Sequence, residues 1–193
     1  MLDQNQIALA ICSFTLGIFA KYADLYNEHG LPEHFKGASA LSGLIWGFAG
    51  MGMIYFSPFG GLTYIAHILY WFQRVKLEYS NHATAGVIMV LSGFLLQGTF
   101  LAAYSMDLLL VFGAYLVTGI IQTYFKVNYP KTKKFWRLRL RIYLIPIVYA
   151  VVRQTIDPII ATGFGMIACE IVTNAYKKYA ADVRGPGAVK ANG

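Results

Sequence analysis

Charged residues are scarce in this sequence of 193 residues, and acidic residues are the scarcest of them. Asp, Glu, Lys and Arg together make up 13% of the chain, whereas an ordinary soluble domain has about 25%. Hydrophobic residues make up 57%, so there are too few charges to cover the surface of a soluble globule of this size. The composition therefore indicates that lipid surrounds most of the chain.

The chain also has few cysteines and no basic stripe along a soluble face. Its two cysteines, Cys12 and Cys169, both lie within apolar runs, so a disulfide framework is not implied. Sixteen basic residues against nine acidic ones give a net charge of +7, but the basic residues cluster at the ends of apolar runs. That distribution is typical of membrane topology signals and argues against nucleic acid as a partner.

Seven apolar runs approach the length of about 20 residues that a helix needs to cross a bilayer. They cover residues 7–22, 38–56, 62–72, 83–104, 108–125, 142–152 and 159–176. We therefore expect an all-α, polytopic membrane bundle with about seven transmembrane helices, formed by residues 1–180. Residues 181–193 are expected to form a polar, flexible cytoplasmic tail.

A basic island between Lys126 and Arg141 orients this bundle, because it holds seven of the sixteen lysines and arginines. Loops rich in Lys and Arg stay on the cytoplasmic side of a membrane. Counting spans from the island places the amino terminus outside and the carboxyl terminus inside, in a multi-pass protein of the cell membrane. The island is also expected to hold anionic lipid headgroups. Outside, Arg153 is expected to pair with Asp157, four residues further on.

Two groups of charged side chains lie beside the inner loops. Asp24 and Glu28 follow the first apolar run, and they share one face with Lys21 if the helix continues. The second group follows the third run and comprises Arg74, Lys76, Glu78, Asn81 and His82. Both groups face the cytoplasm in the predicted topology, so we expect them to meet there.

Such a set of side chains suits an enzyme that acts on a lipid or isoprenoid with a phosphate-type headgroup. Two carboxylates can share a Mg²⁺ ion that also binds substrate phosphates, so Asp24 and Glu28 are the expected metal ligands. The expected catalytic residues are Asp24, Glu28, Glu78 and His82. The expected substrate-binding residues are Lys36, His67, Arg74, Lys76, Asn81, Glu170 and Asn174. The simplest alternative is a solvated junction of helix ends, where headgroups and water accept the charges.

Two other classes of function stay open. Glu170, Asn174 and His67 lie within apolar runs, and an ionisable group at bilayer depth usually faces the bundle interior and marks a pathway. This set favours a transporter or channel for small solutes or ions, including a proton-coupled one. A non-catalytic subunit of a membrane complex is the third hypothesis, because Gly43 and Gly47 form a smooth helix face that suits homo- or hetero-oligomers.

Overall fold

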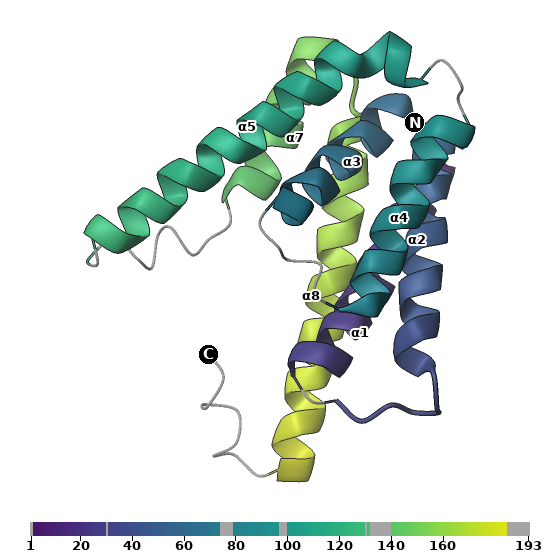
Figure 1. Ribbon diagram of the computed structural model, residues 1–193. Helices are drawn as coiled ribbons and strands as arrows, with labels where there is room; N and C mark the ends of the chain where they lie inside the picture. Colours follow the sequence, from purple (N-terminus) through teal and green to yellow (C-terminus); the bar gives the residue numbers. More distant parts are fainter. Residues whose placement is uncertain are drawn as a thin grey trace.

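The computed structural model describes residues 2–29, 31–73, 79–96, 100–129, 131 and 140–184, which form seven α-helices and no strand. The helices are α1 (Gln4–Glu28), α2 (Ala38–Phe56), α3 (Pro58–Gln73), α4 (Ser80–Leu95), α5 (Phe100–Asn128), α7 (Leu140–Arg153) and α8 (Asp157–Arg184). Successive helices run in alternate directions, so the chain turns at one end after α1, α3 and α5 and at the other after α2, α4 and α7 (Figure 1). The predicted all-α class is confirmed.

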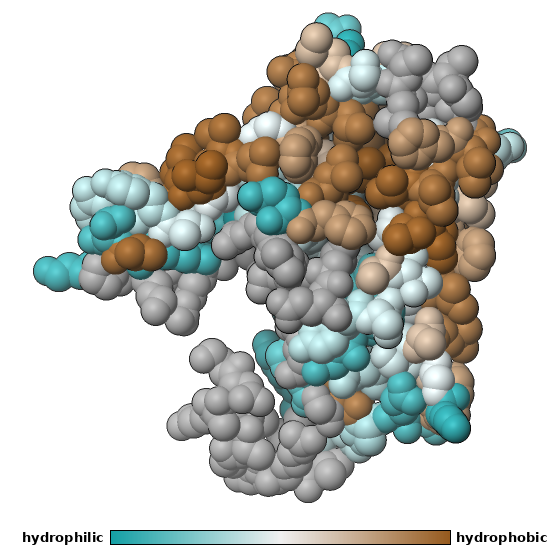
Figure 2. All heavy atoms as spheres, viewed as in Figure 1, coloured by the Kyte–Doolittle hydropathy of each residue, from teal (hydrophilic) through white to brown (hydrophobic). Residues whose placement is uncertain are grey.

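Four of these helices are long and apolar enough to cross a membrane. Their candidate spans are Gln4–Asn27, Ala38–Phe56, Ala103–Asn128 and Asp157–Tyr179. Helices α3 and α4 have 16 residues each and α7 has 14, fewer than the roughly 20 that span a bilayer. Apolar side chains gather over α4 and the upper half of the view, and hydrophilic ones lie at the lower end (Figure 2). A membrane-embedded protein is therefore supported, and seven complete spans stay a prediction.

Helix α1 begins and continues as its sequence predicts. Asp3 and Gln6 form a capping box, in which the Gln6 backbone N–H donates to Asp3 Oδ1 at 2.8 Å. The helix then runs through Asp24 to Glu28, as expected from the pattern of the charged residues. The polar end of α1 therefore projects Lys21 and Asp24 from the same rigid element.

Two predicted boundaries are wrong. The apolar run 83–104 is not one helix, because α4 ends at Leu95 and α5 begins at Phe100; similar hydropathy on both sides hides the break. The gap between the apolar runs 38–56 and 62–72 is also shorter than expected, because Ser57 alone separates α2 from α3. Pro58 starts α3, which suits a residue without an N–H, and Ser57 Oγ accepts a hydrogen bond from the Gly60 N–H at 3.0 Å.

The small-residue face of α2 packs against α4 of the same chain. A Cβ atom on Gly43 would lie 2.6 Å from the Asn81 carbonyl oxygen, and one on Gly47 would lie 2.8 Å from Ile88 Cδ1. Only the absence of these Cβ atoms allows so close an approach. Helix α4 of the same chain therefore occupies the face that carries Gly43 and Gly47, and an oligomer formed through this face stays a prediction.

The expected ion pair between Arg153 and Asp157 is also wrong. Arg153 instead binds the buried Asp107 of α5, through Nε at 2.7 Å and through Nη2. Gln154 has a φ of 51° and ends α7, so Arg153 and Asp157 do not share one helix face. Asp157 accepts a hydrogen bond from Ser57 Oγ at 2.6 Å, which ties the start of α8 to the connection between α2 and α3.

Replacing Gly43 with alanine tests the packing of α2 on α4. Gly43→Ala is expected to destabilise the protein by about 1–3 kcal/mol, the usual cost of overpacking. Gly113→Ala is the matched control, because a Cβ there meets no heavy atom of the described residues within 4 Å. Thermal unfolding of the purified protein in detergent measures both. An equal response of the two variants would contradict the close contact between α2 and α4.

Candidate functional site

A cavity of about 290 Å³ lies between the described helices, close to where α1 ends and α4 begins. Seven helices contribute to its lining. Its charged or titratable lining residues include Lys21, Asp24, His67, His82 and Arg141. Its aromatic lining residues are Trp46, Tyr64, Tyr70, Trp71 and Tyr115. The cavity therefore combines a charged part with an aromatic part.

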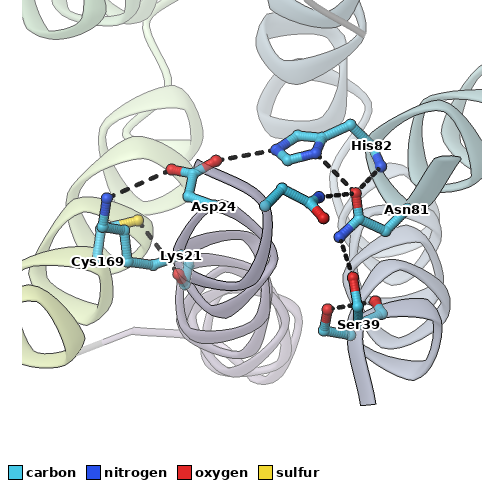
Figure 3. Close-up of polar contacts among 9 residues, drawn as sticks. Lys21, Asp24, Ser39, Asn81, His82 and Cys169 are labelled. Atoms are coloured by element: carbon cyan, nitrogen blue, oxygen red, sulfur yellow. Dashed lines mark hydrogen bonds and ion pairs between the residues drawn. The ribbon is translucent and has the colours of Figure 1, made fainter. Parts of the chain in front are cut away.

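Asp24 and His82 form the polar centre of this site. Asp24 Oδ1 lies 2.9 Å from His82 Nε2, and Asn81 Oδ1 lies 2.8 Å from His82 Nδ1. The same Asn81 oxygen accepts hydrogen bonds from the His82 backbone N–H and from Asn27 Nδ2, each at 2.7 Å. Figure 3 shows Asp24 and Asn81 at the two nitrogens of the histidine ring. Asn81, His82 and Asp24 therefore form one continuous chain of hydrogen bonds.

The orientation of the Asn81 amide determines where the protons lie. The backbone N–H of His82 can only donate, so the Asn81 atom that faces it is the oxygen. That oxygen also faces Nδ1, which must therefore carry a proton. Asn81 Nδ2 donates to Ser39 Oγ at 2.9 Å, which agrees with this orientation. Nε2 then shares one proton with Asp24, and the pair is neutral as a whole whichever atom holds it.

Asp24 and His82 differ in how far their side chains are exposed. The Asp24 side chain is 36% exposed and that of His82 only 5%. Both ring nitrogens of His82 are engaged, so the more exposed Asp24 carboxylate is the part of the pair that a molecule in the cavity would meet. Asn81, expected to bind substrate, is buried and does not line the cavity, and it holds His82 instead.

Two basic residues give the cavity a positive charge. Lys21 Nζ lies 3.5 Å from Asp24 Oδ2, on the side away from His82 (Figure 3). Arg141 donates a hydrogen bond to Gln122, and its Cζ lies 4.9 Å from the centre of the Tyr70 ring. Because Asp24 and His82 are neutral as a pair, Lys21 and Arg141 leave the described lining with a surplus of positive charge when His67 is neutral.

The deep polar set expected from Glu170, Asn174 and His67 does not come together. His67 lines the cavity and stacks on Tyr115, with ring centres 5.0 Å apart and planes at 10°. Glu170 and Asn174 are exposed. The reason is the phase of α8, whose buried face includes Ala161, Gly165, Ala168 and Val172, at helical spacing. Glu170 falls two residues after Ala168 and so points away from the bundle.

The other predicted site residues are only partly described. Lys36 is exposed in the connection between α1 and α2 and does not line the cavity. The remaining ones lie outside the described residues or side chains: Glu28, Arg74, Lys76 and Glu78. Within the described part of the chain, no three His, Cys, Asp or Glu residues converge as a metal site. A Mg²⁺ ion at Asp24 and Glu28 stays a prediction.

Several cavity residues escaped prediction from the sequence, among them Trp46, Tyr115 and Arg141. Trp46 and Tyr115 lie within apolar runs that look alike on every face, so nothing marks them as cavity residues. Arg141 ends the basic island and directly precedes an apolar run. A basic residue at such a boundary can extend its long side chain along the apolar surface, which is the signal that could have identified it.

Comparisons with protein-family models, with curated proteins and with solved structures find no match to this chain.

Removing the Asn81 side chain tests the hydrogen-bond chain. Asn81→Ala is expected to destabilise the protein by at least about 1–3 kcal/mol, the cost of one buried donor left without an acceptor. Asn174→Ala, at an exposed position on α8, is expected to change stability by no more than about 0.5 kcal/mol. Asn81→Asp keeps the acceptor oxygen and should lose less than Asn81→Ala. Thermal unfolding in detergent compares the three, and equal stability of both alanine variants would refute the role of Asn81.

Proposed function

We propose that this chain is a membrane-embedded enzyme that acts on an anionic amphiphile, a lipid or isoprenoid with a phosphate-type headgroup. One observation carries the proposal: a cavity among apolar helices holds a partly exposed carboxylate backed by a buried histidine, with Lys21 and Arg141 in the same lining. Each part of this arrangement has a chemical counterpart in such a substrate.

The positive charge of the cavity supports an anionic ligand. A basic side chain enclosed among membrane helices is costly unless it is paired or solvated. Lys21 and Arg141 exceed the negative charge of the described lining, so an anionic headgroup would offset them. The guanidinium group also suits phosphate oxygens, which it can bind in a bidentate manner. The aromatic lining offers an apolar surface to the rest of an amphiphile.

Asp24 is the residue best placed for proton transfer. In the proposed reaction, a water or alcohol molecule gives its proton to the Asp24 carboxylate while its oxygen bonds to the electrophilic atom of the headgroup. The bond from that atom to the leaving oxygen then breaks, and the leaving oxygen takes up the proton that Asp24 accepted, which restores the carboxylate. His82, fixed by Asn81, orients the carboxylate through the 2.9 Å contact, as a positioned base requires.

Burial argues against a merely solvated junction of helix ends. Asn81 is 2% exposed and His82 is 4% exposed, so headgroups and water do not solvate them. Glu170 is exposed on α8 whereas His67 lines the cavity, which weighs against the transporter hypothesis. Helix α4 packs over Gly43 and Gly47, which weighs against a complex formed through that face. Asp24 and His82, expected in the enzyme, lie 2.9 Å apart, which supports the enzyme hypothesis.

Turnover of defined amphiphiles tests the proposal. Purified protein in phosphatidylcholine nanodiscs is incubated with phosphatidic acid or farnesyl phosphate, with and without Mg²⁺, and products are followed by ³¹P NMR. Asp24→Asn is expected to lower kcat by at least about 100-fold, the typical contribution of a general base. Lys21→Gln should mainly raise KM, whereas Lys177→Gln, at an exposed site on α8, should change neither constant. Turnover that survives Asp24→Asn would exclude Asp24 as the base.

The proposed site faces the cytoplasm, and single cysteines test this orientation. In a variant without Cys12 and Cys169, a cysteine is placed at exposed Asn5 or exposed Lys36. A membrane-impermeant maleimide added to intact cells should label Asn5→Cys, near the amino terminus, because this end lies outside. It should label Lys36→Cys only after the cells are opened. The reverse pattern would invert the topology and place the site outside.

A further inference from the structure

The indole N–H of Trp46 is a buried hydrogen-bond donor without an acceptor among the described residues. Trp46 is 1% exposed and lines the cavity. Its Nε1 is buried and has no hydrogen-bond acceptor among the described residues. A buried donor without an acceptor destabilises a protein, and native structures contain few of them. Because Trp46 lines the cavity, a small turn of the indole on binding would bring this unmet N–H to an acceptor on the molecule that occupies the cavity.

The position of this indole relates it to the Asp24–His82 pair. The rings of Trp46 and His82 lie 5.1 Å apart in an edge-to-face arrangement at 85°. The Trp46 ring also lies 6.1 Å from the ring of Trp71, again edge to face. His82 already donates to Asn81 and shares a proton with Asp24, so its ring is electron-poor and a weak acceptor for an N–H group. A molecule bound beside Asp24 would be next to the indole.

We propose that the Trp46 N–H donates a hydrogen bond to a headgroup oxygen of the substrate and so positions the headgroup next to Asp24. This inference rests on the proposed function and adds to it a residue that determines specificity. An indole N–H can donate but cannot accept, so it selects an oxygen acceptor. The cavity then presents two cations and one neutral donor to the headgroup. That set fits a phosphate monoester with free oxygens better than a headgroup that ends in an ammonium group.

Binding measurements separate this role from simple packing. Farnesyl phosphate and inorganic phosphate are titrated separately into the protein in phosphatidylcholine nanodiscs. Trp46→Phe is expected to weaken binding about tenfold, the effect of one lost hydrogen bond to a charged group. Tyr55→Phe removes a hydroxyl from an exposed position on α2 and should leave binding unchanged. Loss for both probes identifies the phosphate group as the ligand, and loss for farnesyl phosphate alone identifies the phosphorylated amphiphile.

A second replacement keeps the shape of the side chain. With 3-benzothienylalanine at position 46, a sulfur atom replaces the indole N–H. The same tenfold loss of binding is expected, together with unchanged or increased thermal stability without ligand, because no donor is left unmet. Unchanged binding with both replacements would overturn the inference. A lower stability without ligand would also overturn it, because the N–H would then already have an acceptor, such as a buried water. Neither readout depends on turnover, so failure here is distinct from failure of the proposed reaction.

Discussion

The arrangement of the site depends on a single amide oxygen, Oδ1 of Asn81. Donors from Asn27 of α1 and from the backbone and ring of His82 converge on it, while the amide nitrogen reaches Ser39 of α2. Three helices are therefore held at one point, in a region where water cannot replace a lost hydrogen bond. Because the absence of a Cβ on Gly43 is what lets Asn81 of α4 lie so close to α2, helix packing and the proton arrangement of the site depend on the same contact.

The sequence was sufficient for the class of fold and for one side of the site. Low charge and long apolar runs predict helices in a membrane, and the spacing of Lys21 and Asp24 predicts that they share a face of α1. The pairing between helices was not predictable. Hydropathy periodicity describes one helix at a time. It places Glu170 within a span, but it does not show which face of that helix packs against the other helices. Arg153 likewise pairs with Asp107, 46 residues away, and not with the nearby Asp157.

The roles within the site illustrate the same limit. The sequence marks Asp24, Asn81 and His82 as candidates, because polar residues stand out at the ends of apolar runs. It does not show that Asp24 faces the cavity while His82 and then Asn81 lie behind it. That order depends on burial and on the direction of each hydrogen bond. Trp46 has no sequence signal, because an aromatic residue in an apolar run is common. Its importance appears only from an unmet N–H beside a charged pair.

The connection between α2 and α3 restrains two of the helices that line the cavity. Ser57 alone joins the two helices, and its side chain is bound both to the first turn of α3 and to Asp157 of α8. Ser57 therefore ties three helices together at the end of α2 and at the start of both α3 and α8. Trp46 of α2 and Trp71 of α3, which line the cavity, also touch each other edge to face. Because one residue joins the two helices, we expect a bound molecule to shift α2 and α3 together and not separately.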